Sequence, residues 1–270
     1  MFVNSDVKFR SINLWLISLY LLLVLMVVVG GLTRLTDSGL SITKWELFKG
    51  ILPPTTDQEW FLYFSKYKEI PEFIYLNSKM TLNEFKVIFY WEYLHRLLGR
   101  LIGLLSILPL LYFVYKFRNH KISLKKYFSI FILVCIQGFV GWFMVESGLT
   151  ERTDVSHYRL ALHLSLAFII LSLSFWYILE LSNIEKFNYR LPNFLLIIIF
   201  LVLFTQIIFG ALLAGLDGGL IYNTWPDMNG NYFPNDVNLF NIILNDLIST
   251  PSIIQFIHRK IAYIFLGLII

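Results

Sequence analysis

The stretch Ser11–Thr33 contains no charged residue, and no other feature constrains the fold of this chain as strongly. A helix that crosses a membrane needs about 20 mainly apolar residues, and this stretch is long enough. A last apolar stretch starts near Ser252 and continues to Ile270. The remaining apolar stretches are Val87–Tyr115, Tyr127–Val145, Leu160–Leu179 and Leu191–Leu216. The sequence therefore predicts an all-α integral membrane protein with six visible spans.

The composition of the chain excludes a soluble or a disordered protein. Hydrophobic residues make up 57% of the 270 residues, charged residues make up 15%, and the mean hydropathy is +0.67. Soluble domains carry about 25% charged residues, and a single soluble core of this size cannot bury so much apolar surface. Too few polar residues remain to keep an unfolded chain solvated. We therefore expect membrane lipid as a partner, and no nucleic acid, despite the net charge of +4.

The basic residues predict the orientation of the spans. Lys8 and Arg10 precede the first span, and the link between the second and third spans carries no acidic residue. The basic residues of that link are Lys116, Arg118, Lys121, Lys125 and Lys126. By the positive-inside rule both segments are cytoplasmic, so the loops 34–86 and 215–250 face outward. The N-terminus resembles neither a transit peptide nor a cleavable signal, which favours a bacterial inner membrane over a mitochondrial one.

An internal repeat relates the first span to the fifth. The segment Gly30–Trp45 aligns without gaps with Gly210–Trp225, and the next span of each half carries a His-Arg pair, His95-Arg96 or His258-Arg259. Chance similarity between Gly-Leu-rich helix ends explains the first match but not the second. The identical pairs are Gly30/Gly210, Leu32/Leu212, Asp37/Asp217, Gly39/Gly219, Leu40/Leu220 and Trp45/Trp225. We infer a parallel duplication.

The duplication predicts a tandem pair of four-helix bundles with eight spans, two more than this chain shows. We assign residues 1–185, with the long outer loop 34–86, to the first four-helix unit. Residues 186–270 then form an incomplete second unit that contains spans five and six only. We expect the chain to be a fragment, truncated after its sixth span.

Three of the five histidines share one predicted depth in the membrane. His95, His163 and His258 lie near the outer ends of spans two, four and six. An ionisable residue inside a span is costly and indicates a functional site, although a single histidine is more often held by an interhelical hydrogen bond. His120 and His157 lie in loops, and we expect them at the surface.

Imidazole is a common axial ligand of haem iron, and helical bundles hold such groups between facing helices. His95 and His163 would clamp one haem between them. Gly99, one turn after His95, would leave room for a flat ring, although glycine in a membrane helix more often permits close helix packing. Arg159, one turn before His163, would pair with a haem propionate or extend to the membrane interface.

Glu92 lies three residues before His95, on the same face of the helix. One interpretation is an ion pair with Arg96, four residues further on. The other is a carboxylate that accepts a proton, or directs a water, beside the group that His95 ligates. A cytochrome that only transfers electrons has no need of such a carboxylate.

Several motifs resemble those of the haem A synthase family, in the branch shared by alphaproteobacteria and mitochondria. The resemblance covers nearly the whole chain. Its motifs are Gly30–Leu40, Pro53-Pro-Thr-Thr, Tyr67–Phe73, Met80–Lys86, Glu92-Tyr-Leu-His-Arg96, Tyr158–His163 and Gln255-Phe-Ile-His-Arg259.

The resemblance implies an oxidoreductase acting on CH groups, which converts a ring methyl of haem O to the formyl group of haem A during cytochrome oxidase assembly. It implies that His95 and His163 flank the iron of the substrate haem, that His258 ligates the iron of a haem b cofactor, and that Glu92 is the essential carboxylate. Water would supply the oxygen, and haem b would carry electrons to a membrane acceptor. Haem O synthase is the expected protein partner, and a homo-oligomer is an open alternative.

Two other functions compete with this one. A diheme b-type membrane cytochrome that exchanges electrons with quinone also explains the histidines, but it leaves Glu92 and the long outer loop without a role. A transporter with a parallel repeat would place its polar groups near the bilayer midplane. The chain also departs from the family: its first outer loop lacks the cysteine pair of the Gram-positive branch. The second haem b ligand, expected on an eighth span, is absent.

Overall fold

The computed structural model describes residues 5–45, 49–118, 124–150, 152–182, 192–238, 240 and 242–270. Helices dominate this part of the chain, whose only β pairing is an isolated bridge between Met228 and Asn231. The predicted surface position of His120 lies outside the described residues, as does Lys121 of the basic link.

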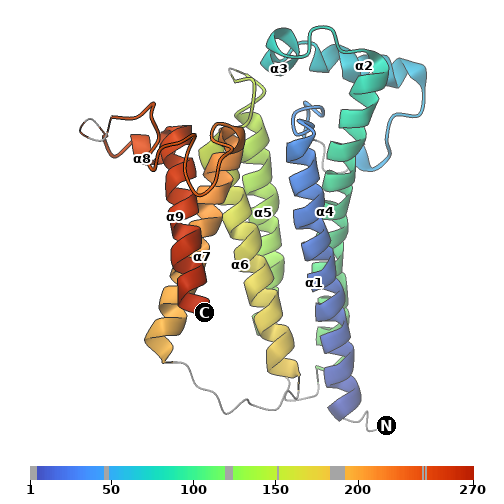
Figure 1. Cartoon of the computed structure of the whole chain (residues 1–270). Coiled ribbons are helices and arrows are strands. Elements are labelled where there is room, and N and C mark those ends of the chain that lie inside the picture. The colour runs from blue at the N-terminus through green and yellow to red at the C-terminus, as the bar shows by residue number, and fades with distance from the viewer. Residues whose placement is uncertain are drawn as a thin grey trace. The chain divides into compact units, whose positions relative to one another are not determined.

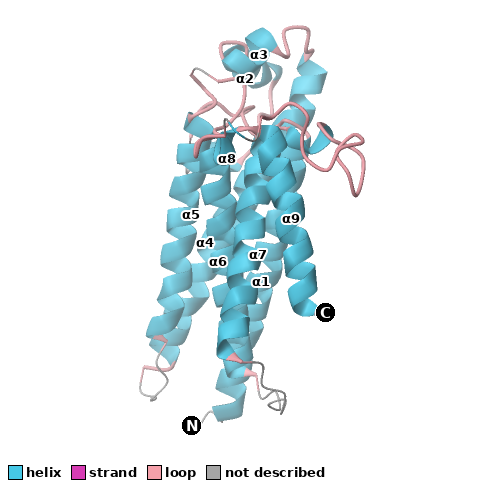
Figure 2. Cartoon of the chain, turned by 60° about the vertical axis from the view of Figure 1, so that its left-hand side comes forward, coloured by secondary structure: helices cyan, strands magenta, loops and turns pink. Residues whose placement is uncertain are grey.

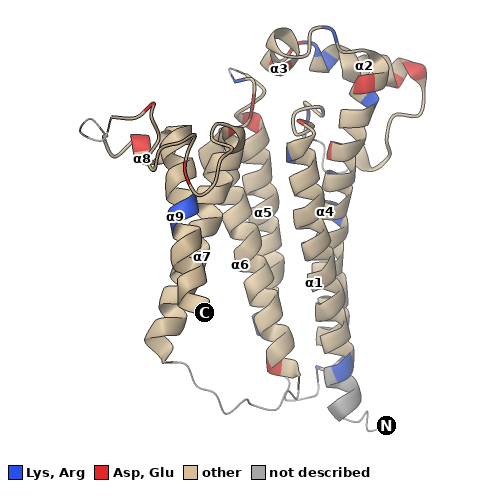
Figure 3. Cartoon of the chain, viewed as in Figure 1, with Lys and Arg blue, Asp and Glu red and all other residues tan. Residues whose placement is uncertain are grey.

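Six helices of the described chain are long and apolar enough to cross a membrane (Figure 1). They are α1 (Ser5–Leu35), α4 (Leu82–Lys116), α5 (Phe128–Glu146), α6 (His157–Leu181), α7 (Asn193–Gly215) and α9 (Pro251–Ile269). Figure 3 shows that charged residues gather toward the helix ends and in the loops, while the middles of the long helices are almost free of them. The predicted all-α membrane fold and its six spans are confirmed.

Short helices lie in the connections, as the helix and loop colours of Figure 2 show. One of these short helices and the span α4 each start with a capping box, in which a threonine side chain and a glutamate three residues later satisfy each other's backbone N–H groups. Thr56 and Glu59 cap α2, and Thr81 and Glu84 cap α4. The short elements are η1 (Lys49–Ile51), α2 (Asp57–Tyr67), α3 (Pro71–Tyr75), η2 (Lys125–Tyr127), η3 (Gly218–Leu220) and α8 (Asp246–Ser249).

The chain divides into two compact units. The first comprises Met1–Val155 and Leu166–Glu185, and the second comprises Ser156–Ser165 and Lys186–Ile270. The start of α6 thus groups with the second unit, and the predicted division into residues 1–185 and 186–270 stays a prediction. That the units are homologous halves of an eight-span protein stays a prediction.

In the first unit α1 packs along α4, and α4 also contacts α2 and α5. The buried core is almost entirely apolar, as expected for a fold stabilised by close packing of helices in lipid. It includes Ile12, Trp15, Leu16, Leu19, Ile102, Leu110, Phe113, Tyr127, Ile130 and Ile170.

A proline inside α4 is compensated by a side chain of α1. Pro109 has no backbone N–H, so the carbonyl of Leu105, four residues earlier, loses its helical partner. The indole N–H of Trp15 donates to that carbonyl over 2.7 Å. The bond satisfies a backbone group that water cannot reach in a membrane, and it aligns α1 with α4.

Aromatic rings join the α2–α3 segment to the start of α4. The ring centroids of Trp60 and Phe89 are 5.0 Å apart, and those of Phe64 and Phe85 are also 5.0 Å apart. Such edge-on and tilted pairs add to the stabilisation from buried area. The long loop between α1 and α4 is therefore a folded layer over the first unit.

In the second unit α7 packs against α9, and α8 contacts both helices. A small apolar cluster of Ala161, Ala211, Leu212 and Ile254 forms its core. Asp236 accepts hydrogen bonds from Tyr222 and Ser252, which tie the loop after α7 to the start of α9.

Candidate functional site

Glu92 is buried in α4, with 3% of its surface exposed, and both of its carboxylate oxygens accept hydrogen bonds. Oε2 accepts from the hydroxyl of Ser41 and from the backbone N–H of Ile42, each over 2.7 Å. Oε1 accepts from Nε of Arg96 over 2.9 Å and from Nη2 over 2.6 Å. The ion pair between Glu92 and Arg96 is thus present, but it is only part of a four-donor cradle.

Arg96 also holds the chain segment that follows α1. Its Nη2 donates to the carbonyl of Ile42 over 2.8 Å, and its Nη1 donates to the carbonyl of Lys44 over 3.1 Å. The guanidinium group therefore bridges the buried carboxylate and two backbone carbonyls. This planar array of donors is what arginine provides and lysine does not.

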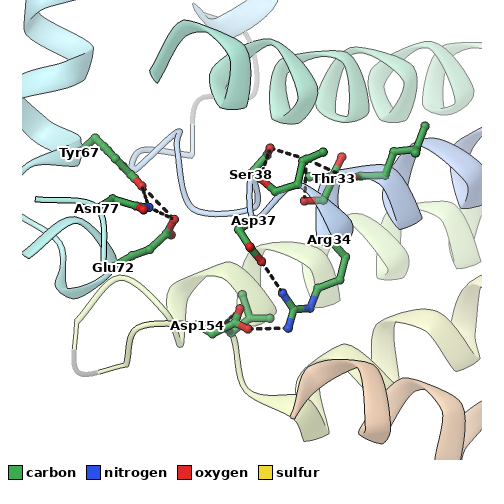
Figure 4. Close-up of polar contacts among 11 residues, drawn as sticks. Thr33, Arg34, Asp37, Ser38, Tyr67, Glu72, Asn77 and Asp154 are labelled. Carbon is green, nitrogen blue, oxygen red and sulfur yellow. Dashed lines mark hydrogen bonds and ion pairs between the residues drawn. The ribbon is translucent and has the colours of Figure 1, made fainter. Parts of the chain in front are cut away.

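The segment turns back over Glu92 at a left-handed residue, two positions after the end of α1. Asp37 has a φ of 47°, a conformation that aspartate tolerates better than most residues. Figure 4 shows Arg34 between two carboxylates. It pairs with Asp37 over 2.9 Å and with Asp154 over 2.8 Å. These contacts hold the end of α1 and the segment behind it in place.

A neighbouring cluster shown in Figure 4 stabilises the loop layer. The phenol of Tyr67 donates to Oε1 of Glu72 over 2.9 Å, and Nδ2 of Asn77 reaches the Tyr67 oxygen at 2.8 Å and Glu72 Oε1 at 3.2 Å. Burial raises the pKa of Glu72 from 4.5 to about 7; the hydrogen bond from Tyr67 opposes this rise, and the nearby carboxylates of Asp154, Glu92 and Asp37 add to it.

His95 of α4 faces a glycine of α1. A Cβ built onto Gly30 would lie 3.3 Å from Nε2 of His95, so the missing side chain leaves space beside the imidazole. A Cβ on Gly99 would lie 3.5 Å from Cε of Met26, an ordinary packing distance. The packing of α1 on α4 therefore does not require a glycine at this position, and the role of Gly99 beside a flat ring stays a prediction.

The second unit repeats this arrangement around His258. A Cβ built onto Gly210 would lie 2.9 Å from Cε1 of His258. The side chain of Gln206 in α7 reaches the same ring, with 3.3 Å between its Nε2 and Nε2 of His258. In both units, therefore, the glycine of the repeat lies against the histidine of the next span.

The Arg of each His-Arg pair also makes equivalent bonds. Nη2 of Arg259 donates to the carbonyl of Tyr222 over 2.6 Å, and Nη1 donates to the carbonyl of Thr224 over 2.8 Å. Tyr222 and Thr224 are the repeat partners of Ile42 and Lys44. Asp217, the partner of Asp37, is left-handed as well, with a φ of 50°. The repeated motif folds in the same way in each unit.

The remaining predicted ligands lie at the start of α6. His163 and Arg159 are both partly buried and belong to the second unit, whereas His95 belongs to the first. The clamping of one haem by His95 and His163 stays a prediction, and so does the pairing of Arg159 with a propionate.

The predicted surface position of His157 is wrong. The residue is only 7% exposed because it is the first residue of α6 rather than part of the preceding loop. It packs against the end of α7, where a Cβ on Gly215 would lie 2.7 Å from Cβ of His157. The loop composition around residue 155 concealed this helix start.

Sequence reasoning missed three polar residues of these sites. Ser41 lies in the loop after α1 and its partner Glu92 is 51 positions away, whereas Glu72 lies in the short helix α3 and its hydrogen-bond partners Tyr67 and Asn77 carry no charge. Gln206 could have been predicted from the sequence as a functional residue, because an amide inside an apolar span is costly and indicates a function. Oε1 of Gln206 and Nδ1 of His258 are buried without a hydrogen-bond partner among the described residues.

Comparison with known proteins identifies the relatives of this chain. The model of the family described as "Cytochrome oxidase assembly protein" matches residues 13–270. The protein of Pelagibacter ubique (strain HTCC1062) named "Heme A synthase" is 58% identical over 100% of this chain and 80% of its own length. A "Heme A synthase" of Rickettsia bellii (strain RML369-C) is 44% identical, over 94% of this chain and 77% of its own length.

A third relative comes from Flavobacterium psychrophilum. It is also named "Heme A synthase" and is 42% identical over 97% of this chain and 78% of its own length. No solved structure matches the chain. The family model and these identities, which extend over nearly the whole chain, show that the chain belongs to the cytochrome oxidase assembly protein family.

Proposed function

We propose that this protein is a haem A synthase, an enzyme that oxidises a ring methyl of haem O to the formyl group of haem A. The names of its relatives support haem A synthesis. The observation that carries the proposal is Glu92, a buried carboxylate held by four donors, three residues before His95. In the overall change a methyl group and one water give a formyl group, four protons and four electrons.

The described residues fit a haem on each His-Arg pair. His95 lies against Gly30 and His258 lies against Gly210, so that in each unit the histidine ring has no side chain between it and the neighbouring helix at that point. Among the described residues, Nδ1 of His258 and Oε1 of Gln206 are buried without a hydrogen-bond partner, which supports a polar ligand beside them. We assign His95 and His163 to the iron of the substrate haem, and His258 to that of haem b. Haem b, when bound, would supply one-electron transfer.

Glu92 would act on the charge that develops as the methyl is oxidised. Its four donors hold the carboxylate in a single orientation, with Arg96 as the only cation among them. Such a preorganised group can stabilise positive charge at a fixed position or accept a proton from an attacking water. The first role stabilises the oxidised methyl, and the second takes up one of the four protons that the reaction releases, with water as the oxygen source.

The cellular setting follows from the same proposal. The protein is a multi-pass protein of the bacterial inner membrane with a cytoplasmic N-terminus, as the distribution of basic residues predicts. It takes haem O from haem O synthase and delivers electrons to a membrane acceptor.

Substitution of Glu92 by Gln tests the proposal, because the amide keeps the shape of the side chain but removes the charge. We expect the conversion of haem O to haem A to slow by at least about 100-fold, the usual size of a proton-transfer contribution. The assay supplies haem O and an electron acceptor to the purified protein and separates the extracted haems. Glu69→Gln, at an exposed position between α2 and α3, is the matched control.

An undiminished rate in Glu92→Gln would remove the carboxylate from the mechanism. If the wild-type protein exchanged electrons with quinone but formed no hydroxylated or formyl haem, it would instead be a diheme cytochrome.

A further inference from the structure

One position of the repeated motif differs in chemistry between the two units. The gapless alignment of the two repeat segments places Ser41 of the first unit on Ile221 of the second. Ser41 is buried, with 1% of its surface exposed, whereas Ile221 is 40% exposed. The two side chains therefore face opposite environments at equivalent points of the same loop.

The two units also differ at the buried side chain of the following span, which each loop covers. Glu92 in the first unit corresponds to Gln255 in the second, and each is 3% exposed. The hydroxyl of Ser41 donates to Oε2 of Glu92 over 2.7 Å. Gln255 instead donates its amide to the carbonyls of Gly219 and Tyr222, over 3.1 Å and 3.0 Å. A hydroxyl is thus present where the buried group is a carboxylate and absent where it is an amide.

The loop does not need this hydroxyl in order to fold. Its left-handed aspartate and its two arginine bonds are formed in the second unit as well, where Ile221 occupies the position. The hydroxyl of Ser41 therefore serves the carboxylate rather than the backbone. The loop of the second unit thus shows how the same motif folds without the hydroxyl.

Serine differs from the other three donors of the cradle in one chemical respect. The backbone N–H of Ile42 and the two N–H groups of Arg96 can only donate, whereas a hydroxyl both donates and accepts. When Glu92 takes up a proton, the hydroxyl oxygen can accept a hydrogen bond from the new O–H group. The carbonyl of Ile88, 3.5 Å from Ser41 Oγ, then lies ready to receive the serine proton.

We propose that Ser41 is the positioning residue of Glu92, which holds the carboxyl group in one orientation both before and after it takes up a proton. This inference rests on the proposed role of Glu92. It assigns to the segment after α1 a specific part in the reaction, and it explains why only the first unit carries a hydroxyl at this point of the repeat.

Three substitutions separate the hydroxyl from the size of the side chain. Ser41→Thr and Ser41→Val have the same shape and differ only in the hydroxyl, and Ser41→Ala removes it without added bulk. We expect the kcat of haem O oxidation to fall about tenfold in the Val and Ala variants, as befits the loss of one of several charge-assisted bonds. The KM for haem O should stay within about twofold, and Thr should recover most of the lost rate.

A spectroscopic readout tests the same contact without turnover. The infrared carboxylate band that disappears in Glu92→Gln identifies Glu92, and its frequency reports the hydrogen bonds to the group. We expect the band to shift in Ser41→Val and Ser41→Ala and to stay near its wild-type position in Ser41→Thr. Ser38→Ala, which removes a buried hydroxyl that bonds to Thr36 rather than to Glu92, should leave the band unchanged.

The outcomes distinguish the two proposals. Equal rates and equal band positions in the Thr and Val variants would overturn the role of Ser41, whatever the effect of Glu92→Gln. Full activity in Glu92→Gln would instead overturn the proposed role of Glu92, even if the infrared band responded to Ser41.

Discussion

The first unit buries two carboxylates in its described part, Glu72 and Glu92, and their partners differ. Glu92 receives a guanidinium group, a hydroxyl and a backbone N–H. The hydrogen bonds that the carboxylate of Glu72 accepts within the described chain come from the neutral side chains of Tyr67 and Asn77. Without a cation to offset burial, the pKa of Glu72 rises to about 7. Glu72 is therefore the acid in this unit that links loop stability to pH.

The raised pKa predicts a loop that is more stable in acid. The folded loop binds the proton of Glu72 more tightly than the unfolded loop does, so this stabilisation is complete below the ordinary pKa of 4.5 and is lost as the pH rises to about 7. The loss in the free energy of unfolding of the loop across this pH range is at most about 3 kcal/mol. Hydrogen exchange of residues 57–77 should accelerate between these pH values, beyond the intrinsic effect of pH on amides.

Glu72→Gln is the matched control, because its amide keeps two hydrogen-bonding atoms and does not titrate. Comparison of the variant with the wild type at each pH cancels the intrinsic pH dependence of exchange. A wild-type profile parallel to that of Glu72→Gln would show that the carboxyl does not control the loop.

At the scale of whole helices, one hydrogen bond from α1 compensates for the proline in α4 and joins the two helices. Trp15 supplies the N–H that Pro109 cannot, at the carbonyl of Leu105. We expect Trp15→Phe to leave that carbonyl unpaired in the membrane and to destabilise the protein by about 1–3 kcal/mol. The midpoint of thermal unfolding in detergent measures the loss.

A second substitution separates the bond from the bulk of the indole. Pro109→Ala restores the helical N–H that bonds to Leu105, so Trp15→Phe should cost less in that background than in the wild type. If the double variant lost as much stability as the two single variants together, the missing hydrogen bond would not be the cause.

At the scale of the whole molecule, each unit places a repeat glycine against a histidine. Gly30→Ala would bring a methyl to 3.3 Å from the His95 ring, and Gly210→Ala would bring one to 2.9 Å from the His258 ring. We expect both variants to retain less haem per chain than the wild type, with the larger loss in Gly210→Ala because its contact is closer. The pyridine haemochrome spectrum of the purified protein measures the haem content.

Neighbouring glycines provide the controls. A Cβ on Gly31 or on Gly219 would meet nothing within 4 Å, so alanine there should leave the haem content unchanged. If Gly31→Ala lost as much haem as Gly30→Ala, the effect would come from the helix backbone rather than from the space beside the histidine.

The parts of this architecture that follow local rules were predictable. The six spans follow from the thickness of a bilayer, which requires long apolar runs, and the confirmed helices match those runs. The ion pair of Glu92 with Arg96 follows from the pitch of one helix. The start of α6 was not predictable in this way, because His157 follows residues of loop-like composition and is buried where it packs against the end of α7 at Gly215.

The sequence by itself determined a multi-pass helical membrane protein with a repeated motif and a Glu-x-x-His-Arg segment, because span length and helical spacing are local properties. Only the tertiary structure decided that Ser41 and Ile42 complete the cradle of Glu92, and that Gly30 and Gly210 face the histidines of the next spans. The cradle contacts join residues 51 and 50 positions apart, and they depend on the path of a loop that no local periodicity encodes.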